Sequence, residues 1–165
     1  MISKQEIERD LIKLKRLYEK APDTHTSVFY SKLAILELSS WIELSFDKIV
    51  KRSINNKLTL CKYQALVESS IKRNNSFSYK NHFIPMLQKI SGLVACEDIE
   101  TKIKSSGKFE QLTNELTILV EERNKAAHVG VRHTTYDAPS VTIQRFKDLY
   151  PTIKDMYTWS VRYCS

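Results

Sequence analysis

The sequence predicts an all-α protein, an up-and-down bundle of four to five helices with short extra helices, folded as one domain over residues 1–165. Glycine and proline number only three and four among 165 residues, and barrels or sandwiches need more of both at their turns. Apolar residues also recur every three or four positions in several segments, which is typical of a helix that buries one face. A chain of this length can bury a sizeable core.

The first two predicted helices cover residues 3–20 and 28–54. The first carries an apolar stripe and ends at residues 21–23, which include a proline that cannot continue a helix. The second has Thr26 or Ser27 as its N-cap. It is apolar around much of its circumference, so we expect it to lie at the centre of the bundle.

Two shorter helices are predicted next, over residues 62–73 and 80–91. An asparagine-rich turn separates them, and Gly92 ends the second because glycine suits the residue after a helix. A polar connection over residues 101–107 leads to the rest of the chain, and residues 97–102 could form a short turn of helix.

The last two predicted helices cover residues 108–127 and 142–163. A polar loop over residues 131–140 joins them, and Thr142 is the expected N-cap of the second. Pro151 lies inside this last helix, where the missing N–H group should cause a kink or a restart.

The net charge of +7 is unevenly distributed along the chain. Between Asp47 and Lys80 there are eight lysine or arginine residues and only two carboxylates, Asp47 and Glu68. Such a surface fits an RNA or DNA backbone or an acidic protein partner, while a solvated lysine-rich face is equally expected. The candidate RNA-binding residues are Lys48, Lys51, Arg52, Lys72, Arg73 and Lys125.

Phe77 and Tyr79 lie within this basic region. Exposed aromatic side chains there would stack on unpaired bases. Aromatic residues lie more often in a core than on a surface, and we favour the core for both.

Other features of the sequence limit the function classes. Three scattered glycines exclude a glycine-rich phosphate loop. The charged start is unlike a signal peptide, and no apolar run approaches the length of a membrane span. The three cysteines, Cys61, Cys96 and Cys164, are far apart and lack metal-binding spacing, so we expect reduced thiols in a cytoplasmic protein that uses neither metal nor cofactor.

The informative stretch is the end of the predicted helix over residues 108–127. Its apolar stripe leads at helical spacing to Arg123, where a charge needs a partner because an unpaired buried guanidinium is very costly. Two glutamates of the second helix are candidate partners. Glu37 falls within that helix's stripe and Glu43 at its margin, and we favour Glu37.

Asn124 and His128 are four residues apart, so they share a face of the same helix beside Arg123. An always-charged arginine can bind phosphate or neutralise a developing oxyanion. An imidazole that titrates near neutrality can move a proton. An arginine and a histidine in the last turns of a helix also suit its negative end, which is a purely structural reading.

The phrase Arg123-Asn124-x-x-x-His128, closing an apolar helix before Gly130, resembles the signature of HEPN domains. These are small all-α domains, and many are metal-independent ribonucleases. The resemblance implies that Arg123 and His128 are catalytic, that Asn124 is part of the motif, and that two copies form one cleft. It also implies a polar residue on the second helix that faces the motif, for which Glu37 and Glu43 are the candidates.

The resemblance predicts a homodimeric endoribonuclease that cleaves RNA by attack of the 2′-hydroxyl, acting as a toxin or phage-defence effector. Some HEPN toxins carry a tyrosine two residues after the motif histidine, where a partner nucleotidyltransferase modifies them. Gly130 occupies this position here, so a different antitoxin or a larger defence-system protein is the expected partner. The alternatives are a non-catalytic HEPN-like module that binds RNA or protein, and a plain helical scaffold.

Overall fold

The computed structural model describes residues 2–54, 57–128 and 135–160, and these residues contain helices and no strand. The all-α prediction is therefore confirmed for the described part of the chain. The elements are α1 (Gln5–Glu19), α2 (Thr24–Ser53), α3 (Cys61–Lys72), the π-helical turn η1 (Tyr79–Phe83), α4 (Ile84–Ser105), α5 (Phe109–His128) and α6 (Pro139–Trp159).

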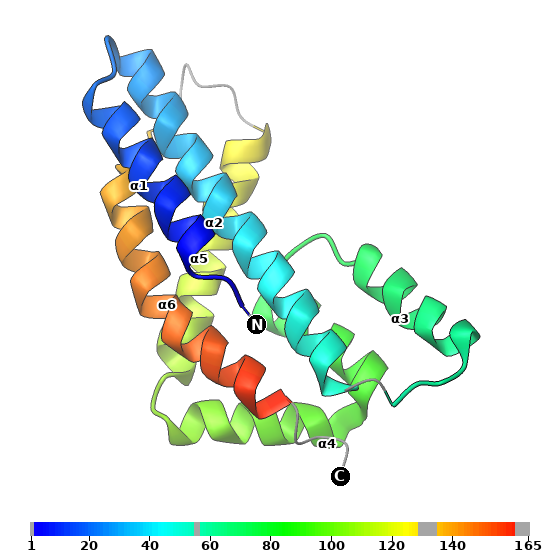
Figure 1. Cartoon of the computed structure of the whole chain (residues 1–165). Helices are drawn as coiled ribbons and strands as arrows, with labels where there is room; N and C mark the ends of the chain where they lie inside the picture. The colour runs from blue at the N-terminus through cyan, green and yellow to red at the C-terminus, as the bar shows by residue number, and fades with distance from the viewer. Residues whose placement is uncertain (1, 55–56, 129–134, 161–165) are drawn as a thin grey trace.

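Helices α1, α2, α5 and α6 run alongside one another, with α4 across one end of this group and α3 standing apart on one side (Figure 1). Helix α2 contacts α1, α4, α5 and α6. The prediction that the second helix is central is therefore confirmed.

Helix α2 can lie at the centre of the bundle because many of its own side chains are apolar or small. Ile42, Phe46 and Ile49 are fully buried. Ser39 is also buried, and its hydroxyl donates to the carbonyl oxygen of Ile35 at 2.8 Å, so its polar group is satisfied inside the helix.

Phe77 and Tyr79, the two aromatic residues singled out in the basic region, belong to the core. Phe77 and Phe83 are fully buried, and Tyr79 is nearly so. The rings of Phe46 and Phe83 lie 4.4 Å apart between centroids. The preference for a core role of Phe77 and Tyr79 is confirmed, and neither ring offers a face to a base.

The N-cap of α2 is Asp23, not Thr26 or Ser27. One carboxylate oxygen of Asp23 accepts the backbone N–H of Thr26 at 2.7 Å, and the other accepts the Thr26 hydroxyl at 3.0 Å. These hydrogen bonds lower the pKa of the Asp23 carboxyl, because they favour its charged form. The helix therefore begins four residues earlier than predicted.

Helix α4 does not end at Gly92. Gly92 has a φ of 86°, which bends the chain, and the helix then resumes and runs to Ser105. It resumes because Ala95, Ile99 and Ile103 recur at helical spacing and are buried. The predicted polar connection over residues 101–107 is wrong for most of its length.

Helix α6 begins at Pro139, so Thr142 lies inside it and is buried rather than capping. Proline is well tolerated in the first turn of a helix. The helix passes through Pro151 without a restart, and the structure describes it to Trp159. The predicted helical residues 161–163 lie outside the described part. No helix among the described residues is long and apolar enough to cross a membrane.

We expect Ile42→Ala to lower the free energy of unfolding by about 2–5 kcal/mol, because it leaves a cavity at a fully buried position of α2. Leu44 is 59% exposed on the same helix, so Leu44→Ala should change stability by less than about 0.5 kcal/mol. Urea unfolding followed by circular dichroism measures both. Equal losses would contradict the assigned rotation of α2.

Candidate functional site

The apolar stripe of α5 is buried as predicted from Leu112 to Leu119, the last apolar residue of the stripe before Arg123. Leu112, Leu116 and Leu119 are 0–1% exposed. Arg123 follows on the same stripe, and its side chain retains 25% exposure. The guanidinium of Arg123 is therefore partly buried and can still be reached from solvent.

Arg123 joins three separate segments through its two terminal nitrogens. Nη2 donates to Oε1 of Glu43 on α2 at 3.0 Å and to the carbonyl oxygen of Asn75, between α3 and η1, at 2.9 Å. Nη1 donates to Oδ1 of Asn124 at 3.1 Å. A guanidinium has five N–H donors, so the hydrogen bonds seen among the described residues leave some of them for an anion.

The partner of Arg123 is Glu43 and not the favoured Glu37. Glu43 is 29% exposed in this ion pair, whereas Glu37 lies exposed on α2. The buried face of α2 runs through Leu38, Ile42 and Phe46. This face turns Glu37 to solvent and leaves Glu43 at the edge of the core, facing α5.

Asn124 and His128 lie at the carboxyl end of α5, and both side chains are exposed. Asn124 already accepts a hydrogen bond from Arg123. His128 is the last residue of the helix, so its imidazole can meet a ligand from solvent. Gly130, His133 and Thr134 lie outside the described residues.

A group of ion pairs around a second arginine, Arg145, holds α5 against α6. The sequence did not lead us to expect it. Arg145 of α6 is 15% exposed and pairs with Glu122, with Glu115 at 3.6 Å and with Asp137 at 3.3 Å. Glu115 and Glu122 are seven residues apart, two helical turns on one face of α5. The sequence signal was this spacing of two carboxylates, together with an arginine next to an apolar residue, Phe146, of the last predicted helix.

The predicted RNA-binding residues divide into two groups. Lys48, Lys72, Arg73 and Lys125 have exposed side chains, so they remain candidates for contacts with phosphate.

The other two have partners within the chain. Lys51 pairs with Glu68 at 2.9 Å. Arg52 donates to the Tyr157 hydroxyl at 3.0 Å and lies over its ring at 4.3 Å, so its predicted contact with RNA competes with a packing role.

Asp47 lies one helical turn after Glu43 on α2. Burial raises the pKa of its carboxyl to about 6; the neighbouring carboxylates of Glu43 and Glu68 add to the rise, and Lys51 opposes it. The surface beside the Arg123–Glu43 pair therefore holds a carboxyl that titrates far closer to neutrality than an ordinary aspartate.

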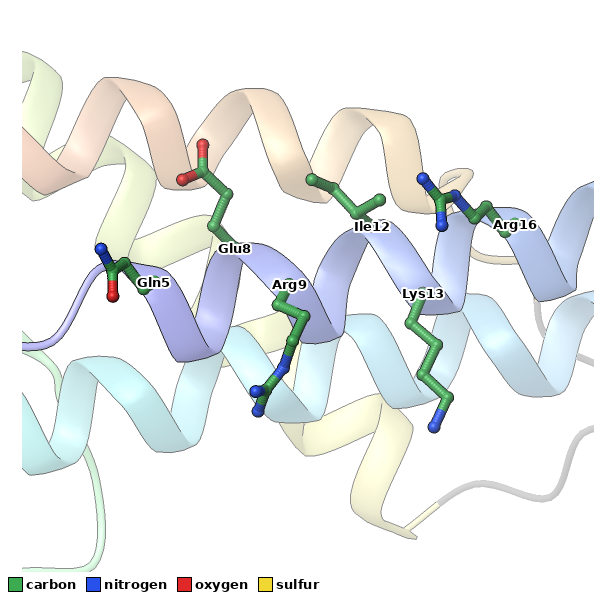
Figure 2. A pocket seen from close by; sticks show the side chains of 6 residues that line it. All are labelled: Gln5, Glu8, Arg9, Ile12, Lys13 and Arg16. Carbon is green, nitrogen blue, oxygen red and sulfur yellow. The ribbon is translucent and has the colours of Figure 1, made fainter.

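The hollow drawn in Figure 2 belongs to another part of the molecule. It measures about 520 Å³, and its six lining side chains all project from α1. It contains no residue of the motif. Across the described residues, no three His, Cys, Asp or Glu side chains are grouped as a metal site.

Comparisons with known proteins add no further assignment. No family model matches the chain, and no match was found among curated proteins or solved structures. The resemblance to HEPN domains therefore rests on the motif, and the geometry of the motif is the ground for any functional proposal.

We expect Glu43→Ala to lower the free energy of unfolding by about 1–3 kcal/mol, because it leaves the partly buried guanidinium of Arg123 without its carboxylate. Glu37→Ala makes the same chemical change on the same helix at an exposed position, and should cost less than about 0.5 kcal/mol. Urea unfolding at pH 7 compares the two. A larger loss for the Glu37 variant would show that the pairing is wrong.

We expect Asp47→Asn to stabilise the protein at pH 7.5 by about 1–2 kcal/mol, a figure reduced from the full pKa shift because the side chain is only partly buried. An ordinary unfolded aspartate has a pKa near 3.9, so the folded protein binds more protons between about pH 4 and pH 6. Wild-type stability should therefore fall as pH rises through this window.

The gain from Asp47→Asn should shrink towards pH 4, where Asp47 is protonated in the folded state. Urea unfolding at several pH values measures it. If the stability of the Asp47→Asn variant depends on pH as that of the wild type does, titration of Asp47 is not the cause of the pH dependence.

Proposed function

We propose that this protein is a metal-independent endoribonuclease of the HEPN type, with Arg123, Asn124 and His128 as its active-site residues. The observation that carries the proposal is the arrangement at the end of α5. Glu43 and the carbonyl of Asn75 hold Arg123 in place at the surface, and the exposed Asn124 and His128 follow on the same helix end.

RNA supplies its own nucleophile, the 2′-hydroxyl. Its oxygen forms a bond to phosphorus while the bond from phosphorus to the 5′-oxygen breaks, which leaves a 2′,3′-cyclic phosphate and a 5′-hydroxyl. One base takes the 2′-hydroxyl proton and one acid gives a proton to the 5′-oxygen.

His128 fits one of these proton-transfer roles, and His128 of a second copy would fill the other at a shared cleft. Arg123 would stabilise the negative charge that gathers on the phosphate. Asn124 would hold the RNA backbone or the His128 ring. The proposal therefore includes a homodimer that binds RNA.

The setting supports RNA as the substrate. Asn75, which accepts from Arg123, is two residues beyond the exposed Arg73, so the basic region meets the motif directly. Lys125 is exposed on the motif helix itself. Positive side chains around a phosphate-binding arginine would attract and position a polyanion.

The resemblance extends the proposal to a biological role. We propose a toxin or phage-defence effector that an antitoxin or a larger defence-system protein restrains. Expression of the wild type in bacterial cells should then arrest growth, and His128→Ala should relieve the arrest.

A second candidate function is a non-catalytic HEPN-like module that binds RNA or protein. One observation favours it: Arg123 already donates to three acceptors, and one of them is the Glu43 carboxylate that neutralises its charge. In that case the motif is a structural ion pair followed by a histidine at the negative end of a helix.

We expect purified protein to cleave RNA in the presence of EDTA and to leave 2′,3′-cyclic phosphate ends. His128→Ala should lower the rate by about 10²–10⁴-fold through loss of a proton-transfer group. Arg123→Lys keeps a cation but not the planar fork, and should lower it by about 10²-fold. Gel analysis of labelled RNA, with end-group mapping, measures both.

His25→Ala is the matched control, because His25 is also exposed but lies in the first turn of α2. It should cleave at the wild-type rate. Circular dichroism should show unchanged helicity in all variants. RNA binding without cleavage, unchanged by His128→Ala, would favour the binding module, and a strict need for added divalent metal would exclude the proposed mechanism.

A further inference from the structure

A groove lies between α3 and α4, at the edge of the hydrophobic core to which its lining residue Val67 belongs. It encloses about 350 Å³, and the residues that line it include Leu58, Tyr63, Leu66, Arg73, Lys89 and Ile90. The described helix α3 stands apart from the bundle, with α4 as its main neighbour (Figure 1). Only Val67 and Ile71 of α3 are buried.

The floor of the groove is apolar and open to solvent. Leu66 is 61% exposed and Tyr63 is 46% exposed, and both line the groove. A partner could cover these exposed apolar side chains. Tyr63 and Leu66 are three residues apart, so they lie on one face of α3 and point into the same groove.

The rim of the groove is positively charged. Arg73, the residue directly after α3, and Lys89 of α4 line it. Between residues 57 and 90 the chain has six lysine or arginine residues and a single carboxylate, Glu68, which is already paired with Lys51. A ligand of this groove must therefore offer apolar side chains for the floor and negative charge for the rim.

We propose that this groove binds an acidic amphipathic helix of a partner protein. A groove between two helices accepts such a helix by its apolar stripe, and carboxylates at the margins of that stripe would meet Arg73 and Lys89. A second copy of this chain fits poorly, because its net charge is also +7. RNA fits poorly because aliphatic side chains give a phosphate backbone nothing to bind.

No motif residue lines the groove, so this proposal does not depend on the catalytic step, and Arg73 is the one residue that it shares with the proposed RNA-binding set. The probe is a fluorescent 16-residue helical peptide with leucines on one stripe and glutamates elsewhere. We expect saturable binding in fluorescence anisotropy that weakens as salt rises. A matched peptide with lysine in place of glutamate should not bind.

Leu66→Ser should weaken binding of the glutamate peptide about tenfold, which corresponds to about 1.4 kcal/mol. Leu44→Ser is the matched control, because Leu44 is 59% exposed on α2, outside the groove. It should leave the affinity within twofold of the wild type. The double change Arg73→Glu and Lys89→Glu should remove binding of the glutamate peptide, with helicity unchanged in every variant.

Several results would overturn the proposal. One is an absence of saturable binding, and another is equal weakening of peptide binding by Leu66→Ser and Leu44→Ser. If single-stranded RNA competes with the peptide, and Leu66→Ser weakens RNA binding as much as peptide binding, the groove is a nucleic-acid surface. If sedimentation shows that the protein associates with itself, and Leu66→Ser abolishes this association, the groove binds a second copy of the chain.

Discussion

The arrangement of the candidate site depends on one partly desolvated charge, the guanidinium of Arg123. It lies on the buried stripe of α5 between Leu119 and Ala126, and only 25% of its side chain is exposed, so it needs acceptors on the neighbouring segments. Glu43 supplies a carboxylate from α2, and Asn75 supplies a carbonyl from the connection after α3. One side chain therefore ties together the central helix, the motif helix and the basic segment.

The end of α5 is held from a second direction as well. Glu122, the neighbour of Arg123, pairs with Arg145 of α6, which also meets Glu115 and Asp137. Two adjacent residues of α5 are thus engaged by different helices, which fixes the rotation of its last turns. The backbone that carries the exposed Asn124 and His128 is therefore held in place, as the proposed catalytic role requires.

The basic charge of the protein serves two surfaces with different chemistry. Near the motif, Arg73 and Lys125 have exposed side chains, which suits the proposed RNA substrate. Between α3 and α4, Arg73 and Lys89 border exposed apolar side chains, which suits an acidic amphipathic helix. Because Arg73 belongs to both, a protein bound in the groove would lie next to the proposed RNA path, as a restraining partner would.

The sequence by itself determined the all-α class, the buried stripe of α5, the core role of Phe77 and Tyr79, and the need of Arg123 for a carboxylate. Periodicity and the cost of burying charge are local properties, so they can be read without a structure. Only the tertiary structure decided that Glu43 and not Glu37 is the partner, that α4 resumes after Gly92, and that Arg145 holds α5. The rotation of α2 follows from packing against four neighbours at once, and α4 resumes because the core accepts Ile99 and Ile103. Both outcomes depend on residues far away in the sequence, which decide the side of α2 that is covered and whether the periodic residues after Gly92 are buried.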